Sequence, residues 1–135
     1  MRRIALLLLL ATLALPASAQ EVGGAKVLPA DGLAALLADG ATWDFRAPGS
    51  TGTQSFAADG SARIVWQRRD GGGGGESTGR WRQEGDTLCV RWERLGQGKE
   101  SCVRFYAFGA GVWRTLDART NDDRAVFMPP GTPQD

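Results

Sequence analysis

From Gly40 to Met128, short runs rich in Trp, Phe, Val and Thr alternate with turns that contain glycine. Aromatic and β-branched residues favour strands, and glycine supplies the backbone freedom that tight turns need, so the pattern is typical of antiparallel β-structure. It predicts an all-β domain, a small antiparallel meander or barrel of about eight strands. The expected strands are Thr42–Ala47, Thr53–Ala57, Ala62–Arg68, Thr78–Gln83, Thr87–Arg94, Ser101–Phe108, Val112–Leu116 and Arg124–Met128.

One short N-terminal helix is expected before the strands, over residues 33–38. Asp31 stands at the position expected of an N-cap and Gly40 follows the last turn, which are common start and stop signals of helices. Three leucines share one face of this helix, so we expect it to plug or flank an apolar interior. They are Leu33, Leu36 and Leu37.

Aromatic side chains are expected to fill much of the interior. An eight-stranded barrel is just wide enough to be filled by side chains or to hold one small ligand. The chain has five Trp and five Phe. We therefore expect a filled or nearly filled interior rather than a large ligand cavity, and core packing rather than a sugar-binding platform for the tryptophans. These are Trp43, Trp66, Trp81, Trp92 and Trp113.

Residues 1–19 have the three parts of a cleavable secretory signal peptide. The chain begins with two arginines, an apolar run covers residues 4–15, and residues 17–19 (Ala-Ser-Ala) form a cleavage signal. The apolar run is too short for a membrane span, which needs ~20 residues. We therefore expect a periplasmic or secreted protein with no transmembrane span.

The remainder divides into a loose N-terminal arm (20–28), a single β-rich domain (29–128) and a proline-rich, disordered tail (129–135). This length suits one domain and not two. Without the two arginines of the signal, 14 basic residues stand against 15 acidic ones. A balance so close to neutral gives no electrostatic reason to expect nucleic acid or an anionic membrane as the main partner.

The register of the central hairpins follows from their turns. If residues 85 and 86 form a two-residue turn, Trp81 lies opposite Val90. A slip of one residue would place Trp81 opposite Cys89 and scatter the apolar side chains over both faces. In the next hairpin we pair Cys89 with Cys102, which keeps the same face apolar. That face then carries Trp81, Leu88, Val90, Trp92, Val103 and Phe105.

The opposite face of these strands is rich in arginine. Arg80 is expected directly across from Arg91, and like charges in that position destabilise a sheet unless they are compensated. Two interpretations stay open, a solvated face with mixed charges or a site for an anion or an acidic partner. The arginines of this face, called the arginine face below, are Arg80, Arg82, Arg91 and Arg104. Acidic residues that could neutralise it are Glu84, Glu93 and Glu100.

Cys89 and Cys102 are the two cysteines of the chain. An even number of cysteines in an exported protein indicates a disulfide, and two cysteines allow only one pairing. Closing a loop of this length is worth ~3 kcal/mol in the chain-entropy model.

The absence of histidine narrows the possible chemistry. It excludes histidine-dependent nucleophilic sites, histidine-ligated metals and the commonest general base. With both cysteines bonded, no thiolate nucleophile or ligand remains, so we expect no enzymatic activity, no catalytic residue, no metal site and no cofactor. The carboxylates that could do acid–base work are interpreted as turn formers or surface charges. They are Asp44, Asp59, Asp86, Glu93 and Glu100.

Two loops invite a ligand-binding interpretation. The run Gly71–Gly75 lacks the Gly-Lys-Ser/Thr that opens a phosphate-binding helix, so a flexible hairpin loop is expected. The spacing of Asp117, Asn121, Asp122 and Asp123 matches no calcium loop, so a polar turn is expected there.

Several turn, tryptophan and cysteine positions together resemble a family of small exported proteobacterial proteins known only as a domain of unknown function. They are Gly79-Arg80-Trp81, Gly85-Asp86-Thr87-Leu88-Cys89, Trp92 and Cys102-Val103, with Asp59-Gly60 and the entry Leu36-Leu37, Gly40 and Trp43 before them. The resemblance implies a periplasmic β-rich module and supplies no activity. A weaker resemblance, to lipocalin-type barrels, rests on Gly40-Ala41-Thr42-Trp43, which is one residue longer than the usual Gly-x-Trp of that family.

The expected function is a non-enzymatic exported binding or protein-interaction module whose partner is an unknown protein or small ligand. Two alternatives stay open, a lipocalin-like carrier of a small apolar ligand and an inhibitor of a cell-wall hydrolase. An apolar cavity of several hundred Å³ would favour the carrier. A filled barrel with a protruding loop would favour protein interaction.

Overall fold

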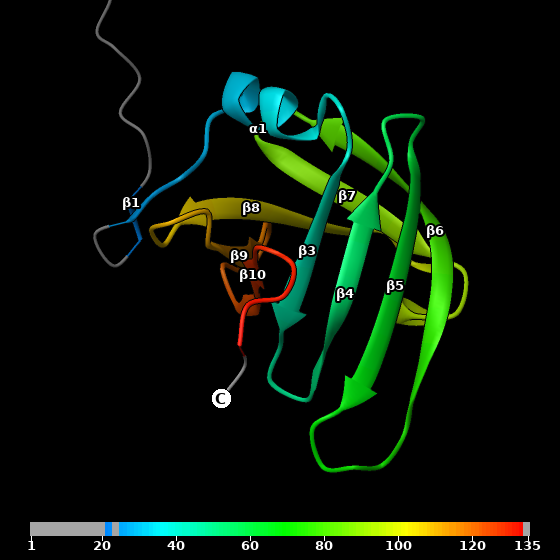
Figure 1. Ribbon diagram of the computed structural model, residues 1–135. Helices are drawn as coiled ribbons and strands as arrows, with labels where there is room; N and C mark the ends of the chain where they lie inside the picture. Colours follow the sequence, from blue (N-terminus) through cyan, green and yellow to red (C-terminus); the bar gives the residue numbers. More distant parts are fainter. Residues whose placement is uncertain (1–20, 23–24, 134–135) are drawn as a thin grey trace, which may run out of the picture.

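A closed antiparallel barrel forms the body of the protein in a computed structural model that describes residues 21–22 and 25–133 (Figure 1). The predicted all-β fold with one short helix is confirmed, whereas the predicted signal peptide lies outside the described residues. The strands follow one another around the barrel in chain order, and β10 closes it against β3. They are β3 (Ala41–Arg46), β4 (Ser50–Phe56), β5 (Ser61–Arg68), β6 (Gly74–Glu84), β7 (Thr87–Trp92), β8 (Ser101–Ala107), β9 (Trp113–Asp117) and β10 (Asp123–Met128).

The remaining elements are short. The strands β1 (Glu21–Val22) and β2 (Ala25–Lys26) form a separate two-stranded sheet, and η1 (Gly96–Gly98) is a 3-10 turn between β7 and β8. The single α-helix of the described residues is α1 (Ala30–Leu37). Among these residues, no helix has the length and apolar character that a membrane crossing requires.

The predicted strand register is confirmed in both central hairpins. Trp81 lies opposite Val90 in the pairing of β6 with β7, and Cys89 lies opposite Cys102 in the pairing of β7 with β8. The alternation of side chains therefore sends Leu88 into the interior and leaves the arginine face outside. Closure of the barrel pairs every strand on both sides, so none of its eight strands presents an open edge.

Helix α1 covers the end of the barrel where β3 begins (Figure 1). Leu33 and Leu37 are buried in the core, as the shared apolar face predicted. The predicted N-cap is wrong, because Pro29 occupies that position and its carbonyl accepts the N–H of Leu33 at 2.9 Å. Asp31 instead lies in the first turn, where a carboxylate interacts favourably with the positive end of the helix dipole.

The segments that precede and follow the barrel strands in the chain both contact the barrel. The N–H of Leu28 donates to the carbonyl of Phe105 at 2.7 Å, and Val27 forms a bridge with Tyr106. In the segment that follows β10 in the chain, the N–H of Gly131 donates to a carboxylate oxygen of Asp44 at 2.7 Å. Residues 27–28 thus lie against β8, and the turn after β10 lies against β3.

Aromatic rings pack together in the half of the barrel beside α1. Trp43 stacks on Phe127 with ring centroids 5.2 Å apart, and it meets Phe56 and Phe105 at tilted angles. Such ring pairs are worth ~0.5–1.5 kcal/mol beyond the area they bury. All five tryptophans belong to the core or pack against it, so their predicted role in packing is confirmed.

Candidate functional site at the open end of the barrel

Among the residues that the structure describes, α1 covers one end of the barrel. Leu33 and Leu37 of α1, together with the aromatic cluster around Trp43, fill the half where β3 begins. The opposite half is bounded by the ends of β3, β5, β7 and β9, and no α-helix of the described residues covers it (Figure 1). Any internal space therefore opens toward the end of the barrel far from α1.

A cavity of about 210 Å³ occupies this open half. This small volume agrees with the prediction of a filled or nearly filled interior rather than a large ligand cavity. The remaining space lies far from α1, where small and medium side chains such as Ala125, Val90 and Val103 line the wall. Thr115 adds little polarity, since its hydroxyl exchanges hydrogen bonds with the backbone of Ala125. Aromatic and aliphatic side chains form most of the wall: Phe45, Phe56, Ile64, Leu88, Trp92 and Phe127.

The size of the cavity limits what it can hold. An engineered apolar cavity of ~150 Å³ takes up benzene, so a volume of about 210 Å³ suits roughly eight carbon atoms. Drug-sized ligands need pockets of ~300–1,000 Å³. The open half can therefore accept a short alkyl chain or a small ring and not a large lipid.

An ion pair lies at the mouth of the cavity. Arg124 lines the cavity and donates from Nη2 to Oδ2 of Asp117 at 2.7 Å. Asp117 is nearly buried, and its Oδ1 accepts the backbone N–H groups of Arg119 and Thr120 at 2.8 and 3.1 Å. The hydrogen bond from Arg124, helped by these two N–H groups, lowers the pKa of Asp117 to about 2, so this carboxylate is ionised at neutral pH.

A β-bulge places Arg124 at this position. Asp123 pairs with Leu116 and Ala125 with Thr115, so Arg124 is the extra residue in β10. A bulge breaks the simple alternation of a strand and can aim a side chain in a new direction. The neighbouring Asp123 is held outside by Arg114, which donates two hydrogen bonds to it and thereby lowers its pKa.

A polar hollow continues outward from the cavity. It has a volume of about 480 Å³ and shares Ser101 and Arg124 with the cavity. We call it the vestibule. Its charged side chains are three cations and two acids: Lys99, Arg119, Arg124, Glu100 and Asp117. The open end thus combines an apolar interior with a charged, mainly cationic entrance.

The arginine face lies on the outer surface of β6, β7 and β8. Arg80 stands across from Arg91, as predicted. Arg82 is neutralised within the face, because it donates to both carboxylate oxygens of Glu100 at 2.9 and 2.6 Å and to Glu84 at 2.7 Å. The hydrogen bonds from Arg82, followed by the charges of Arg82 and Arg91, lower the pKa of Glu100.

Arg104 is also engaged inside the molecule. It donates to the carboxylate of Asp86 at 3.3 Å and to the carbonyl of Ala118 at 2.7 Å. The arrangement brings all four arginines of the face to one surface. Two of them, however, are held by acidic side chains, so Arg80 and Arg91 contribute most of the charge that the face presents to solvent.

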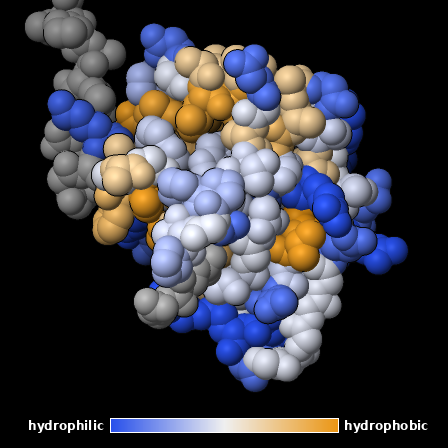
Figure 2. Space-filling model, viewed as in Figure 1, coloured by the Kyte–Doolittle hydropathy of each residue, from blue (hydrophilic) through white to orange (hydrophobic). Residues whose placement is uncertain are grey.

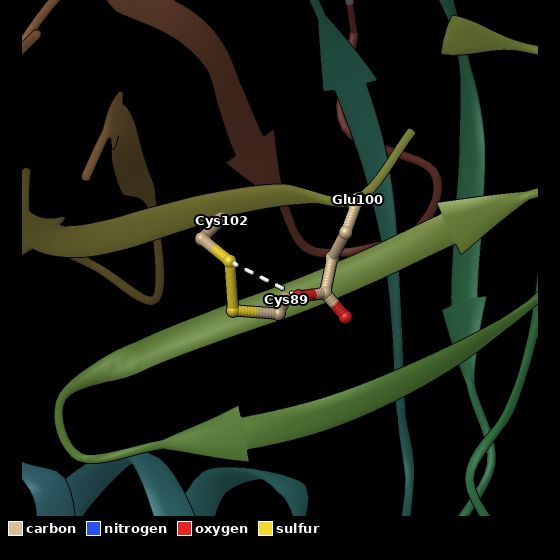
Figure 3. Close-up of side chains that lie close together, drawn as sticks. All are labelled: Cys89, Glu100 and Cys102. Atoms are coloured by element: carbon tan, nitrogen blue, oxygen red, sulfur yellow. Dashed lines mark hydrogen bonds between the residues drawn. A yellow bond between two sulfur atoms is a disulfide. The ribbon is translucent and has the colours of Figure 1, made fainter. Parts of the chain in front are cut away.

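The predicted disulfide joins β7 to β8 beside the arginine face (Figure 3). Cys89 is completely buried, and the sulfur of Cys102 lies 3.9 Å from a carboxylate oxygen of Glu100. A disulfide sulfur carries no proton to donate, and metal binding requires a thiolate. In the bonded state Cys89 and Cys102 form a covalent link between the two strands, and Glu100 only lies beside it.

The glycine run forms the tip of a hairpin that extends past the rest of the barrel (Figure 1). Asp70 bonds Arg68 at 2.7 Å and the backbone of Gly72 at 2.7 Å, which orders the turn. The surface near this tip is hydrophilic or neutral, whereas apolar surface gathers around α1 (Figure 2). The predicted hairpin loop is confirmed.

Arg124 is a candidate functional residue that the sequence pattern did not predict. The residues between Asp117 and Asp123 form the polar turn that the sequence predicted. The signal that could have indicated more was the combination of a strand-end aspartate with an arginine seven residues later across a tight turn. A comparison with known proteins matches no protein-family model, no curated protein and no solved structure.

Proposed function

We propose that this protein is a non-enzymatic exported binding module that holds a small, mainly apolar ligand in the open end of its barrel. The observation that carries the proposal is the apolar cavity of about 210 Å³, which is sealed by α1 and the aromatic cluster on one side and opens on the other. Burial of apolar surface in such a site is favourable by ~25 cal/mol per Å². The cavity is smaller than the several hundred Å³ expected of a lipocalin-like carrier, so the geometry supports a site for short apolar ligands only.

Two further observations support the non-enzymatic, exported character. The chain lacks histidine, and Asp117, the carboxylate beside the cavity, has a pKa of about 2. A general acid or base works best when its pKa lies near the operating pH, so this group is poorly suited to proton transfer at neutral pH. The disulfide suits an oxidising compartment such as the periplasm, to which the pattern of residues 1–19 would direct the chain.

The proposal is tested with a series of neutral alcohols from 1-butanol to 1-decanol, titrated into the mature protein. Trp92 lines the cavity, so its fluorescence reports occupancy, and calorimetry gives the affinity. Burial of each added methylene group should make the binding free energy more favourable by about 0.8 kcal/mol, so the affinity should rise roughly fourfold per carbon. The rise in affinity should stop at roughly eight carbons, because a longer chain no longer fits in the cavity.

A cavity-filling variant provides the specific control. Val103→Phe places a ring in the cavity wall and should abolish alcohol binding while the barrel stays folded. The matched variant is Val65→Phe, because Val65 is 38% exposed on the outside of β5 and should tolerate the same change without loss of binding. Affinities that do not depend on chain length, or equal binding by both variants, would contradict the proposal.

A further inference from the structure

The ligand site has two parts of different chemistry, and Arg124 is the charged residue that lines both of them. Arg124 lines the apolar cavity, the vestibule and a groove of about 370 Å³ on the outside of the barrel. Its side chain is about half exposed. A molecule whose apolar part enters the cavity can therefore place its other end beside the guanidinium group of Arg124.

The guanidinium group has hydrogen-bonding capacity to spare. A guanidinium carries five N–H donors, and Arg124 uses Nη2 for its bond to Asp117. Asp117 does not depend on Arg124 alone, since the backbone N–H groups of Arg119 and Thr120 also bind it. A second anion can thus approach Arg124 while the carboxylate of Asp117 keeps its partners.

The charges around the vestibule favour an anion over a cation. Lys99 and Arg119 are both exposed and add positive charge to that of Arg124. Glu100 is the other acid of the vestibule, and both of its oxygens already accept hydrogen bonds from Arg82. A cationic head group would find each nearby carboxylate occupied, whereas an anionic one meets free donors.

We propose that the ligand is an amphiphile with an apolar part of roughly eight carbons and an anionic head, a carboxylate or a phosphate ester, which Arg124 binds at the mouth of the barrel. This inference rests on the proposed function and adds the chemical class of the ligand. The planar fork of arginine matches the two oxygens of either head group, so the shared chemistry is a terminal anion with two or more acceptor oxygens.

The test compares four eight-carbon ligands in the mature protein: octanoate, octyl phosphate, 1-octanol and octylamine. The two anions should bind about fivefold more tightly than 1-octanol, which is the upper range for a solvent-accessible ion pair, and octylamine more weakly than 1-octanol. The advantage of the anions should shrink in 1 M salt, where the Debye length is ~3 Å. Their relative affinities decide between a carboxylate and a phosphate ligand.

Variants separate Arg124 from general charge effects. Arg124→Gln should remove the advantage of octanoate over 1-octanol, so that the two ligands bind this variant with equal affinity. Asp117→Asn/Arg124→Gln should do the same without leaving a buried carboxylate unpaired. The control is Arg63→Gln, because Arg63 pairs with Glu76 on the outside of the barrel and should not affect octanoate.

The outcomes distinguish this inference from the proposed function. Equal affinities of octanoate and 1-octanol in the unaltered protein would overturn the anionic head and leave the apolar cavity as the binding site. An equal loss of octanoate binding in Arg63→Gln would also overturn it, since the effect would then come from net charge. If 1-octanol and the anions all fail to bind, the proposed function itself is wrong.

Discussion

Replacement of Asp117 by asparagine should reveal how strongly the ion pair at the mouth supports the barrel. The folded protein holds the pKa of this carboxyl at about 2, compared with an ordinary value of 3.8. A difference of this size corresponds to about 2 kcal/mol of stability at neutral pH. The figure is an upper bound, because the partner Arg124 is 51% exposed and solvent screens its charge.

The sign of the pH dependence follows from the lowered pKa. The unfolded chain takes up a proton on Asp117 near pH 3.8, whereas the folded protein does so only near pH 2. The stabilisation is therefore fully present above about pH 5 and is lost progressively as the pH falls toward 2. Asp117→Asn should lower stability at pH 7 and flatten the curve between pH 2 and 5.

Urea denaturation followed by tryptophan fluorescence, repeated at intervals from pH 2 to 7, measures this effect. Asp70→Asn is the matched control, because Asp70 pairs with Arg68 on the exposed hairpin, where both side chains are about 60% exposed. It should change stability by no more than ~1 kcal/mol. If the curves of Asp117→Asn and the unaltered protein run parallel across this range, the account of the ion pair is refuted.

Three other predictions concern the rest of the barrel. Cys89→Ala/Cys102→Ala should cost ~3 kcal/mol in urea unfolding, and free-thiol labelling of the denatured, unreduced protein should give no signal; two labelled thiols would contradict the disulfide. Tyr106→Phe should leave stability unchanged or raise it by ~1 kcal/mol, because the buried hydroxyl of Tyr106 has no hydrogen-bond partner among the described residues; a large loss in thermal unfolding would show that such a partner exists. Arg80→Ser/Arg91→Ser should scarcely change stability, and loss of a salt-sensitive partner in affinity capture from periplasmic extract would support a binding role for the arginine face, whereas unchanged capture would mean that the face is only solvated.

The sequence carried most of the information about the strands. In a β-strand successive side chains point to opposite faces, so the placement of Trp81, Leu88 and Val90 allows only one register that keeps them together. The two-residue turn at 85–86 then sets the partners, and the observed pairing agrees. The disulfide could also be predicted from the sequence, because two cysteines allow only one pairing.

The helix start and the chain ends were harder to anticipate. Pro29 and Asp31 are both acceptable near the first turn of a helix, and a difference of two residues depends on contacts with the barrel. Residues 27–28 show no strand pattern of their own. Their structure comes from hydrogen bonds to β8, and such a long-range contact cannot be predicted from the local sequence.

The cavity and the role of Arg124 depend on the closed barrel. The amino-acid composition predicted a filled or nearly filled interior but not where the remaining space would lie. The rings of Trp43, Phe105 and Phe127 gather in the half beside α1 and leave a small cavity in the other half. Their distribution along the barrel axis is set by the stagger of all the strands together.

Local patterning thus determined which residues form strands, which faces are apolar and which cysteines pair, because each of these follows from the period of two and from turn chemistry. Tertiary structure alone decided where the interior stays empty and which charges meet at its mouth. Arg124 reaches Asp117 because a bulge in β10 inserts one extra residue and the β9–β10 turn folds the two strands together. A side-chain direction that depends on a break in the alternation cannot be read from the alternation itself.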